Sequence, residues 1–316
     1  MRPLPSLDDI RKGGKLALSR MLTRLETEAE TAEVAGFLDE ACTNGAGLVL
    51  GLTGPPGVGK STLTDALIRN YRSSGLSVAV LAIDPSSQFT GGALLGDRTR
   101  LQTDPDDAAV FVRSMAARDR LGGLSDHAIA AIAMLRAVVD RVIVESVGIG
   151  QSEGDLVQAC DTLLLCIQPG SGDSLQFMKA GIMELPDVVA VTKADMGASA
   201  RRAASDVAGA LSLSRQMQTG WRVPVCEVSA RTGQGLDDLV AAVSDHGEFM
   251  DRTGALVPKR LRQQGHWLRD MVRTRFGTAG LETVVKQLSE TSVQPFGTYR
   301  RIALELSARL ERPAAD

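Results

Sequence analysis

A glycine-rich stretch that ends in a lysine and a hydroxyl carries the clearest chemistry in this sequence. Residues 54–61 read G-P-P-G-V-G-K-S and fit the phosphate-binding pattern G-x-x-x-x-G-K-S/T at every fixed position. Glycines let the backbone curl so that successive N–H groups face a phosphate. We expect Lys60 to reach the outer phosphates and the Ser61 hydroxyl to ligate Mg²⁺. The residues predicted to hold the phosphates are Gly54, Pro55, Pro56, Gly57, Val58, Gly59, Lys60, Ser61 and Thr62.

A strand-like run precedes this stretch and a helical pattern follows it. Residues 48–53 read L-V-L-G-L-T, which is typical of a buried strand, and residues 61–72 have helical periodicity. A helix that begins near Lys60 would direct the positive end of its dipole toward a bound phosphate. The alternative interpretation is a glycine-rich turn with an incidental lysine, and the strand–loop–helix order argues against it. The stretch therefore predicts a nucleotide-binding protein.

Two acidic residues stand at the ends of later strand-like runs. Asp84 closes the run 77–84 and precedes a proline, and Glu145 closes the run 141–145. Ligands of an open parallel sheet bind at the carboxyl ends of the strands, where an acidic residue can hold Mg²⁺ directly or through water. The alternative for each residue is a carboxylate at the rim of the protein surface. The glycines of residues 146–151 suit a loop that approaches the terminal phosphate and shifts when that phosphate leaves.

A second short motif indicates which base is bound. Residues 192–195 read T-K-A-D and match the guanine-reading pattern N/T-K-x-D. The Asp195 carboxylate would accept from guanine N1–H and the exocyclic amine, a pair of donors that adenine lacks. Thr192 stands where asparagine is commoner, which slightly weakens the hydrogen bonds that brace the loop. The pattern predicts GTP rather than ATP, with a polar turn at a strand end as the alternative. The residues predicted to hold the base are Thr192, Lys193, Asp195, Ser229 and Ala230.

Apolar runs that alternate with helical segments predict the fold that positions these motifs. Their continuous rather than alternating apolarity is typical of strands buried on both faces, as in a parallel sheet flanked by helices. The runs are 48–53, 77–84, 109–112, 141–145, 161–167, 187–192 and 223–228. We predict an α/β protein with a doubly wound, mostly parallel sheet. The predicted parts are an N-terminal helical segment 1–45, a GTPase domain 46–250 and a C-terminal helical extension 251–316, with interruptions near Gly277, Gly280 and Pro295.

Composition excludes several classes of function. The 316 residues include only 3% aromatics and carry a net charge of −3, which argues against base stacking and general polyanion binding. Four cysteines form no C-x-x-C pair and only three histidines accompany them, so we expect buried reduced thiols rather than a zinc or nickel site. No apolar run approaches the roughly 18–20 residues that span a bilayer. We expect a cytoplasmic protein without nucleic-acid or membrane partners.

Several longer loop motifs together resemble one family, the MeaB/ArgK/methylmalonic-aciduria type A GTPases. The motifs are D-P-S-S at 84–87, G-G-A-L-L-G-D-R-T-R at 91–100, E-S-V-G-I-G-Q-S-E at 145–153, P-G-S-G-D at 169–173 and T-K-A-D at 192–195. The resemblance extends from about Leu16 to Leu310. It implies a homodimeric G-protein chaperone of an adenosylcobalamin-dependent acyl-CoA mutase, with a C-terminal helical extension that supports dimerisation. Such proteins gate the loading of intact cofactor and protect or rescue the mutase from inactivation.

The same resemblance assigns roles to residues. It implies that Mg²⁺ and the attacking water are positioned by Ser61, Asp84, Asp97 and Glu145. The backbone N–H of Gly148 is expected to sense the γ-phosphate. The predicted catalytic residues are Lys60, Asp84, Asp97, Glu145 and Gly148. Residues 169–179 resemble a mobile segment that couples the nucleotide state to the mutase. Its predicted partner-coupling residues are Gly170, Asp173, Gln176 and Lys179, although Lys179 can also be read as a solvated helix lysine. This chain departs from the family in two ways, which leave the dimer geometry open: its N-terminal extension is short, and the tail after residues 265–267 is weakly similar.

The hypothesis that follows is slow GTP hydrolysis, in which Mg²⁺ and Lys60 offset phosphate charge while a positioned water attacks. Gln151 is close in sequence to the loop that is expected to contact the γ-phosphate, so it is considered as the residue that positions the attacking water. Rival readings are a metal-insertion GTPase, which would carry His or Cys ligands, and a kinase or ATPase of amino-acid (LAO/AO-type) transport, which would need an acceptor site. A partition-type ATPase would have a lysine where Pro55 stands, and a binding module would not hydrolyse GTP. Methylmalonyl-, ethylmalonyl-, isobutyryl- and 2-hydroxyisobutyryl-CoA mutase all remain open as partners.

Overall fold

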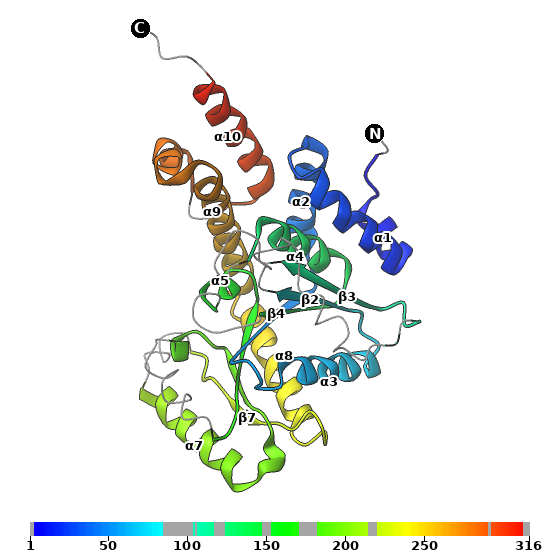
Figure 1. The fold of residues 1–316 in the computed structure, drawn as a ribbon, viewed down its shortest axis with the longest axis vertical. Coiled ribbons are helices and arrows are strands. Elements are labelled where there is room, and N and C mark those ends of the chain that lie inside the picture. Colours follow the sequence, from blue (N-terminus) through cyan, green and yellow to red (C-terminus); the bar gives the residue numbers. More distant parts are fainter. Residues whose placement is uncertain are drawn as a thin grey trace.

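The strands of this protein form one parallel sheet. The computed structural model describes residues 3–84, 104, 106–116, 124–146, 153–170, 182–213, 220–289 and 292–311. The strands are β1 (Leu48–Thr53), β2 (Val78–Asp84), β3 (Val110–Ala116), β4 (Arg141–Ser146), β5 (Thr162–Ile167), β6 (Val188–Val191) and β7 (Val225–Glu227). Their order is β3-β2-β4-β1-β5-β6-β7, and each neighbouring pair is parallel. This confirms the predicted α/β fold, with a strand at each of the seven predicted runs (Figure 1).

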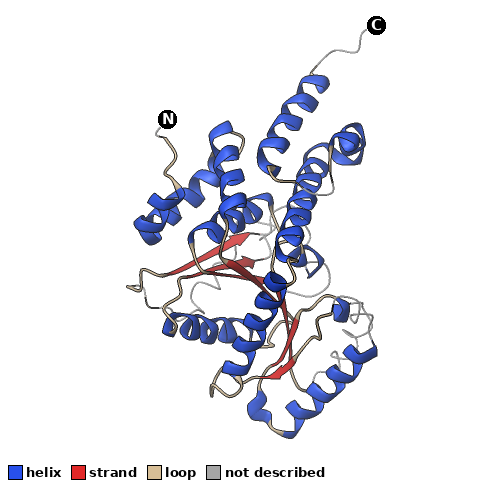
Figure 2. Ribbon diagram, turned by 180° about the vertical axis from the view of Figure 1, so that it is seen from behind, coloured by secondary structure: helices blue, strands red, loops and turns tan. Residues whose placement is uncertain are grey.

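Helices cover both faces of this sheet (Figure 2). The α-helices are α1 (Leu7–Thr27), α2 (Ala32–Asn44), α3 (Lys60–Ser73), α4 (Asp126–Val138), α5 (Glu153–Val157), α7 (Ala198–Leu213), α8 (Leu236–Arg252), α9 (Leu256–Val284) and α10 (Pro295–Leu310). Short 3₁₀ helices are η1 (Ile182–Glu184), η2 (Ala194–Met196) and η4 (Val285–Gln287). None of the helices in the described part of the chain has an apolar stretch long enough to cross a membrane.

The two largest apolar clusters of the core lie on opposite faces of the sheet. Alternate residues of the same strands belong to different clusters: Val49 belongs to the one that includes residues of α1, α2 and α4, whereas Leu50 belongs to the one that includes residues of α3 and α8. The same division holds for Val142 and Ile143 of β4. Burial on both sides is why the strands read as continuous apolar runs instead of alternating ones. Residues 162–167 of β5 are all buried, as expected of an interior strand.

The helices after residue 255 form an arm that begins against the sheet and then extends away from it (Figure 1). The outer part of α9 and α10 share a small apolar core that includes Leu268, Val272 and Ile302. Gly277 has φ 69° and breaks α9 at a predicted interruption, and Pro295 starts α10 as predicted. Gly280 remains within the helix, so the interruption expected there is absent. The three-part division of the chain stays a prediction.

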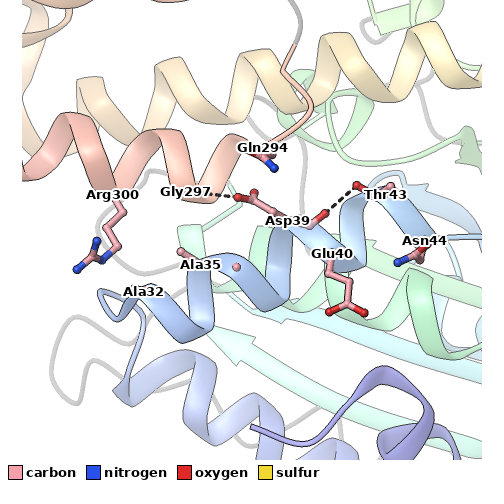
Figure 3. Close-up of a pocket in the computed structure, with 10 residues that line it drawn as sticks. Ala32, Ala35, Asp39, Glu40, Thr43, Asn44, Gln294, Gly297 and Arg300 are labelled. Atoms are coloured by element: carbon pink, nitrogen blue, oxygen red, sulfur yellow. Dashed lines mark hydrogen bonds between the residues drawn. The ribbon is translucent and has the colours of Figure 1, made fainter. Parts of the chain in front are cut away.

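Two buried aspartates attach the arm to the rest of the molecule. Arg260 of α9 donates to both carboxylate oxygens of Asp161, at 2.9 and 2.7 Å, just before β5 begins. Asp39 of α2 accepts the backbone N–H groups of Phe296 and Gly297, at 3.0 and 2.9 Å, and so caps the first turn of α10. Figure 3 shows Asp39 directed at that turn, beside a cavity of about 500 Å³ between α2 and α10. These two aspartates therefore fix the start of α9 and the start of α10.

Candidate functional site

The loop between β1 and α3 has the backbone shape that its glycines predict. Gly54, Gly57 and Gly59 have φ values of 145°, 74° and 102°, in the region that residues with a Cβ rarely adopt. A Cβ on Gly54 would also lie 2.4 Å from the carbonyl oxygen of Cys166 on the neighbouring strand β5. The loop leads directly into the N-terminus of α3 at Lys60. A curled loop followed by a helix N-terminus is an arrangement that binds phosphate.

Lys60 is folded back over this loop. Its ammonium donates to the carbonyl oxygens of Gly54 at 2.7 Å and Pro55 at 3.1 Å, and the residue is only 7% exposed. A buried charge requires such partners, because removing it from water is costly. The lysine is consequently held over the loop that a phosphate would occupy. It can exchange carbonyl oxygens for phosphate oxygens without leaving the loop.

Glu145 lies beside the first turns of α3, at the carboxyl end of β4. The Ser61 hydroxyl donates to Glu145 Oε1 and the Thr64 hydroxyl donates to Oε2, both at 3.0 Å. Ser61 and Thr64 are three residues apart and so share one face of the helix. Glu145 is 4% exposed. A serine hydroxyl and a carboxylate at the end of a phosphate loop are hard oxygen ligands of the kind that Mg²⁺ prefers, so these residues fit that cation.

The base-reading motif is tied to the phosphate loop by two side chains. Thr192 donates its hydroxyl to the carbonyl oxygens of Val58 at 2.8 Å and Ile167 at 3.1 Å. Lys193 donates to the carbonyl oxygen of Gly57 at 3.1 Å, and its φ of 56° is left-handed. Threonine at position 192 therefore does brace the loop, despite being the less common residue. The two motifs form one connected site.

Asp195 has the properties that a guanine-reading carboxylate needs. Its Oδ1 accepts from the Ser229 hydroxyl at 2.7 Å and its Oδ2 accepts from Arg231 at 3.0 Å. The hydrogen bond from Ser229, with a smaller contribution from Arg231, holds the pKa of the Asp195 carboxyl below its ordinary value. Asp195 is therefore ionised at neutral pH, and an ionised carboxylate only accepts hydrogen bonds. Guanine N1–H and its exocyclic amine are the matching donors.

Three of the four cysteines are buried. Burial raises the pKa of Cys166, which lies beneath the phosphate loop, to about 12. Cys42 and Cys160 are also buried, and burial raises the pKa of each to about 12. Cys226 is only partly buried, which differs from the expectation that all four thiols are buried. All four are free thiols.

The structure places some of the predicted residues and leaves others undescribed. The phosphate and base motifs meet at the carboxyl edge of the sheet, because that edge carries the ends of β1, β4, β6 and β7. Asp84 ends β2, and Ile83 beside it pairs with Ser146 of β4, so the two strand ends are neighbours. Gly170 ends the described part of its segment with φ 76°. Outside the described residues lie Asp97, Gly148, Gln151, Asp173, Gln176 and Lys179.

Two residues of the site were not predicted from the sequence. Thr64 contacts Glu145, and the available signal was its position three residues after Ser61, on the same helix face. Arg231 contacts Asp195, and the signal was a basic residue directly after the predicted guanine loop. Neither signal is specific, because helices and loops commonly carry such residues for solvation.

Comparisons with known proteins agree with this geometry. The family model described as methylmalonyl-CoA mutase-associated GTPase MeaB matches residues 18–283. A protein of Pyrococcus abyssi named as a GTPase is 38% identical over 310 residues, which is 95% of each chain. The mouse protein named methylmalonic aciduria type A homolog, mitochondrial, is 35% identical over 71% of this chain and 55% of its own length. A crystal structure described as a LAO/AO transport system kinase has a TM-score of 0.67 and 26% identity, and it covers 97% of this chain and 96% of its own.

Proposed function

The chain belongs to the MeaB family of GTPases, and from that premise we propose that it hydrolyses GTP as a chaperone of an adenosylcobalamin-dependent acyl-CoA mutase. The observation that carries the nucleotide part is the connected site at one edge of the sheet. There Thr192 and Lys193 join the phosphate loop to the carboxylate of Asp195. The observation that carries the partner is the family description itself, since its members are associated with methylmalonyl-CoA mutase.

In the proposed complex the phosphates accept from the backbone N–H groups of residues 54–61 other than the two prolines, and Lys60 exchanges the carbonyls of Gly54 and Pro55 for phosphate oxygens. Asp195 accepts from the guanine edge, while the stem of Lys193 packs over the ring. Ser61 and Glu145 would hold Mg²⁺, which when bound would offset the negative charge of the phosphates. Electrostatic stabilisation by groups already in place is the main contribution that such a site makes to phosphoryl transfer.

We assign the remaining catalytic roles from the family resemblance. Asp84 and Asp97 would complete the set that positions cation and water, and Gly148 would donate its backbone N–H to the γ-phosphate. Gln151 is a candidate for orienting the attacking water. Slow turnover suits a switch, because the partner must read the GTP state before it decays.

The proposed partner interactions lie at two places on the chain. The segment 169–179 would couple nucleotide state to the mutase, with Gly170, Asp173, Gln176 and Lys179 in contact. The helical arm would pair two copies of this chain, and it carries exposed apolar side chains that suit such a contact: Val285, Val293, Leu304 and Leu310. We propose the cytoplasm as the site of action.

A capture experiment tests the partner. Tagged protein in the GDP-bound, GTP-bound and nucleotide-free states would be mixed with extract of the native host, and retained proteins identified by mass spectrometry. GTP hydrolysis would then be measured with and without the captured mutase and adenosylcobalamin. Retention of a B12-dependent mutase in at least one state is expected. Retention of no B12 enzyme in any state would reduce the proposal to a GTPase of another pathway.

A transport-linked kinase is a second candidate, because a solved structure described as a LAO/AO transport system kinase covers nearly the whole chain. The two functions differ in where the γ-phosphoryl group goes. With GTP labelled in its γ-phosphate, hydrolysis releases inorganic phosphate and leaves protein unlabelled. Stable label on a protein of the host extract would favour the kinase.

A further inference from the structure

Glu145 is held by two hydroxyls that have different surroundings. Ser61 stands at the end of the phosphate loop, whereas Thr64 lies three residues further into α3 and is 0% exposed. At a rise of about 1.5 Å per residue, Thr64 lies about 4.5 Å further from the loop along the helix axis. Each hydroxyl donates to a different oxygen of the carboxylate, at 3.0 Å. The carboxylate is therefore fixed in its rotation as well as in its position.

The two hydrogen bonds restrict a side chain that would otherwise be flexible at a cation site. Glutamate has one more rotatable bond than aspartate, so its carboxylate reaches further but is less well defined. When Ser61 also ligates a cation through its oxygen, its hydroxyl serves two groups. Thr64 serves only the carboxylate among the contacts that the structure gives it. A donor on Oε2 leaves Oε1 facing Ser61 and the phosphate loop.

We propose that Thr64 is a positioning residue for Mg²⁺, acting through Glu145. The proposal rests on the proposed function, since it assumes that Mg²⁺ binds with a guanine nucleotide at Ser61 and Glu145. Hydrogen-bond partners of metal-binding carboxylates orient the ligand, and their loss typically costs 10- to 100-fold in metal affinity. The opposing explanation is that the hydroxyl only ties α3 to β4.

The test compares Thr64→Val, which replaces the hydroxyl by a methyl group, with Thr64→Ser, which keeps it. Mg²⁺ would be titrated into each protein bound to fluorescent N-methylanthraniloyl-GDP in a chelating buffer, and the midpoint of the fluorescence change recorded. We expect Thr64→Val to raise the midpoint about tenfold and Thr64→Ser to change it less than about twofold. Affinity for the nucleotide without Mg²⁺ should be unchanged in both. Steady-state GTP hydrolysis by Thr64→Val should recover in excess Mg²⁺.

A matched control separates positioning from stability. Thr162 is also buried, and its hydroxyl makes one side-chain hydrogen bond, to His246 Nδ1 at 2.8 Å, at the amino end of β5. Thr162→Val should lower the melting temperature and leave the Mg²⁺ midpoint unchanged. If Thr64→Val does not fold, Thr64→Ala takes its place. Alanine also lacks the hydroxyl but is smaller, and we expect the same increase in the Mg²⁺ midpoint. A Thr64 variant without the hydroxyl that keeps the wild-type Mg²⁺ midpoint overturns the inference but not the proposed function. A wild-type protein that binds no guanine nucleotide overturns both.

Discussion

At the scale of single residues, Asp195 determines base preference through the direction of its hydrogen bonds. Both of its oxygens accept hydrogen bonds, from Ser229 and Arg231, and they would accept from guanine in the complex. Asp195→Asn replaces one acceptor by a donor and therefore suits xanthine, which presents an acceptor where guanine has its amine. We expect affinity for GDP to fall on the order of a thousandfold and affinity for xanthosine diphosphate to rise. Calorimetry with both nucleotides measures the exchange, and an unaltered base preference would refute the guanine assignment.

Lys60 is the residue whose removal should weaken phosphate binding most. Its ammonium lies over the loop and is bonded to two loop carbonyls. Lys60→Ala should lower affinity for GTP by about a hundredfold, because a charge-assisted hydrogen bond is lost. Arg309→Ala, at an exposed pair on α10, is a control that should leave GTP affinity unchanged. Equal GTP affinity in Lys60→Ala and wild type would contradict the assigned role.

At the scale of secondary-structure elements, one buried ion pair contributes to the attachment of α9 to the sheet. The side chains of Arg260 and Asp161 are 12% and 4% exposed. Arg260→Ala leaves the buried Asp161 without its bidentate partner, which should cost about 3–5 kcal/mol of unfolding free energy. Arg309→Ala removes an exposed pair with Glu305 and should cost less than about 1 kcal/mol. Urea unfolding of the two variants measures the difference, and equal losses would show that the Arg260–Asp161 pair is not needed to hold α9.

The same ion pair should make the stability of the folded state depend on pH in the acidic range. Burial works to raise the pKa of Asp161, but the hydrogen bonds and charge of Arg260 outweigh it and hold the pKa below its ordinary value. A carboxyl with a depressed pKa in the folded state stabilises the fold above the ordinary aspartate pKa of about 3.9. That stability is lost as the pH falls through the lower, folded-state value. Melting temperatures between pH 7 and pH 3 should fall less steeply for Arg260→Ala than for wild type, and parallel curves would argue against this origin.

At the scale of the whole molecule, the sequence predicts the sheet better than it predicts the contacts between loops. Residues 162–167 are all buried and form an almost uninterrupted apolar run, so the sequence predicts strand β5. The predicted run 109–112 ended too early, because the edge strand β3 continues through the polar Arg113 and Ser114. The pairing of Thr64 with Glu145 joins residues 81 positions apart. Such a contact depends on how a helix packs on a strand, which no local pattern specifies.

The proposed role of the helical arm, pairing two copies of this chain, is tested by measuring the oligomeric state. Its helix α10 buries Ile302 and Leu306 against α9 but leaves Leu304 57% exposed and Leu310 more so. A contiguous exposed apolar patch is typical of a surface that another chain covers, and we propose that these two leucines contribute to one. If two copies pair through this arm, the wild type should sediment as a dimer, and the double variant Leu304→Glu, Leu310→Glu should sediment as a single chain with an unchanged melting temperature. Leu16→Glu is the matched control, because Leu16 on α1 is 59% exposed and should leave the dimer intact. Sedimentation velocity distinguishes these outcomes, and a dimer that survives both glutamates would place the contact elsewhere on the protein.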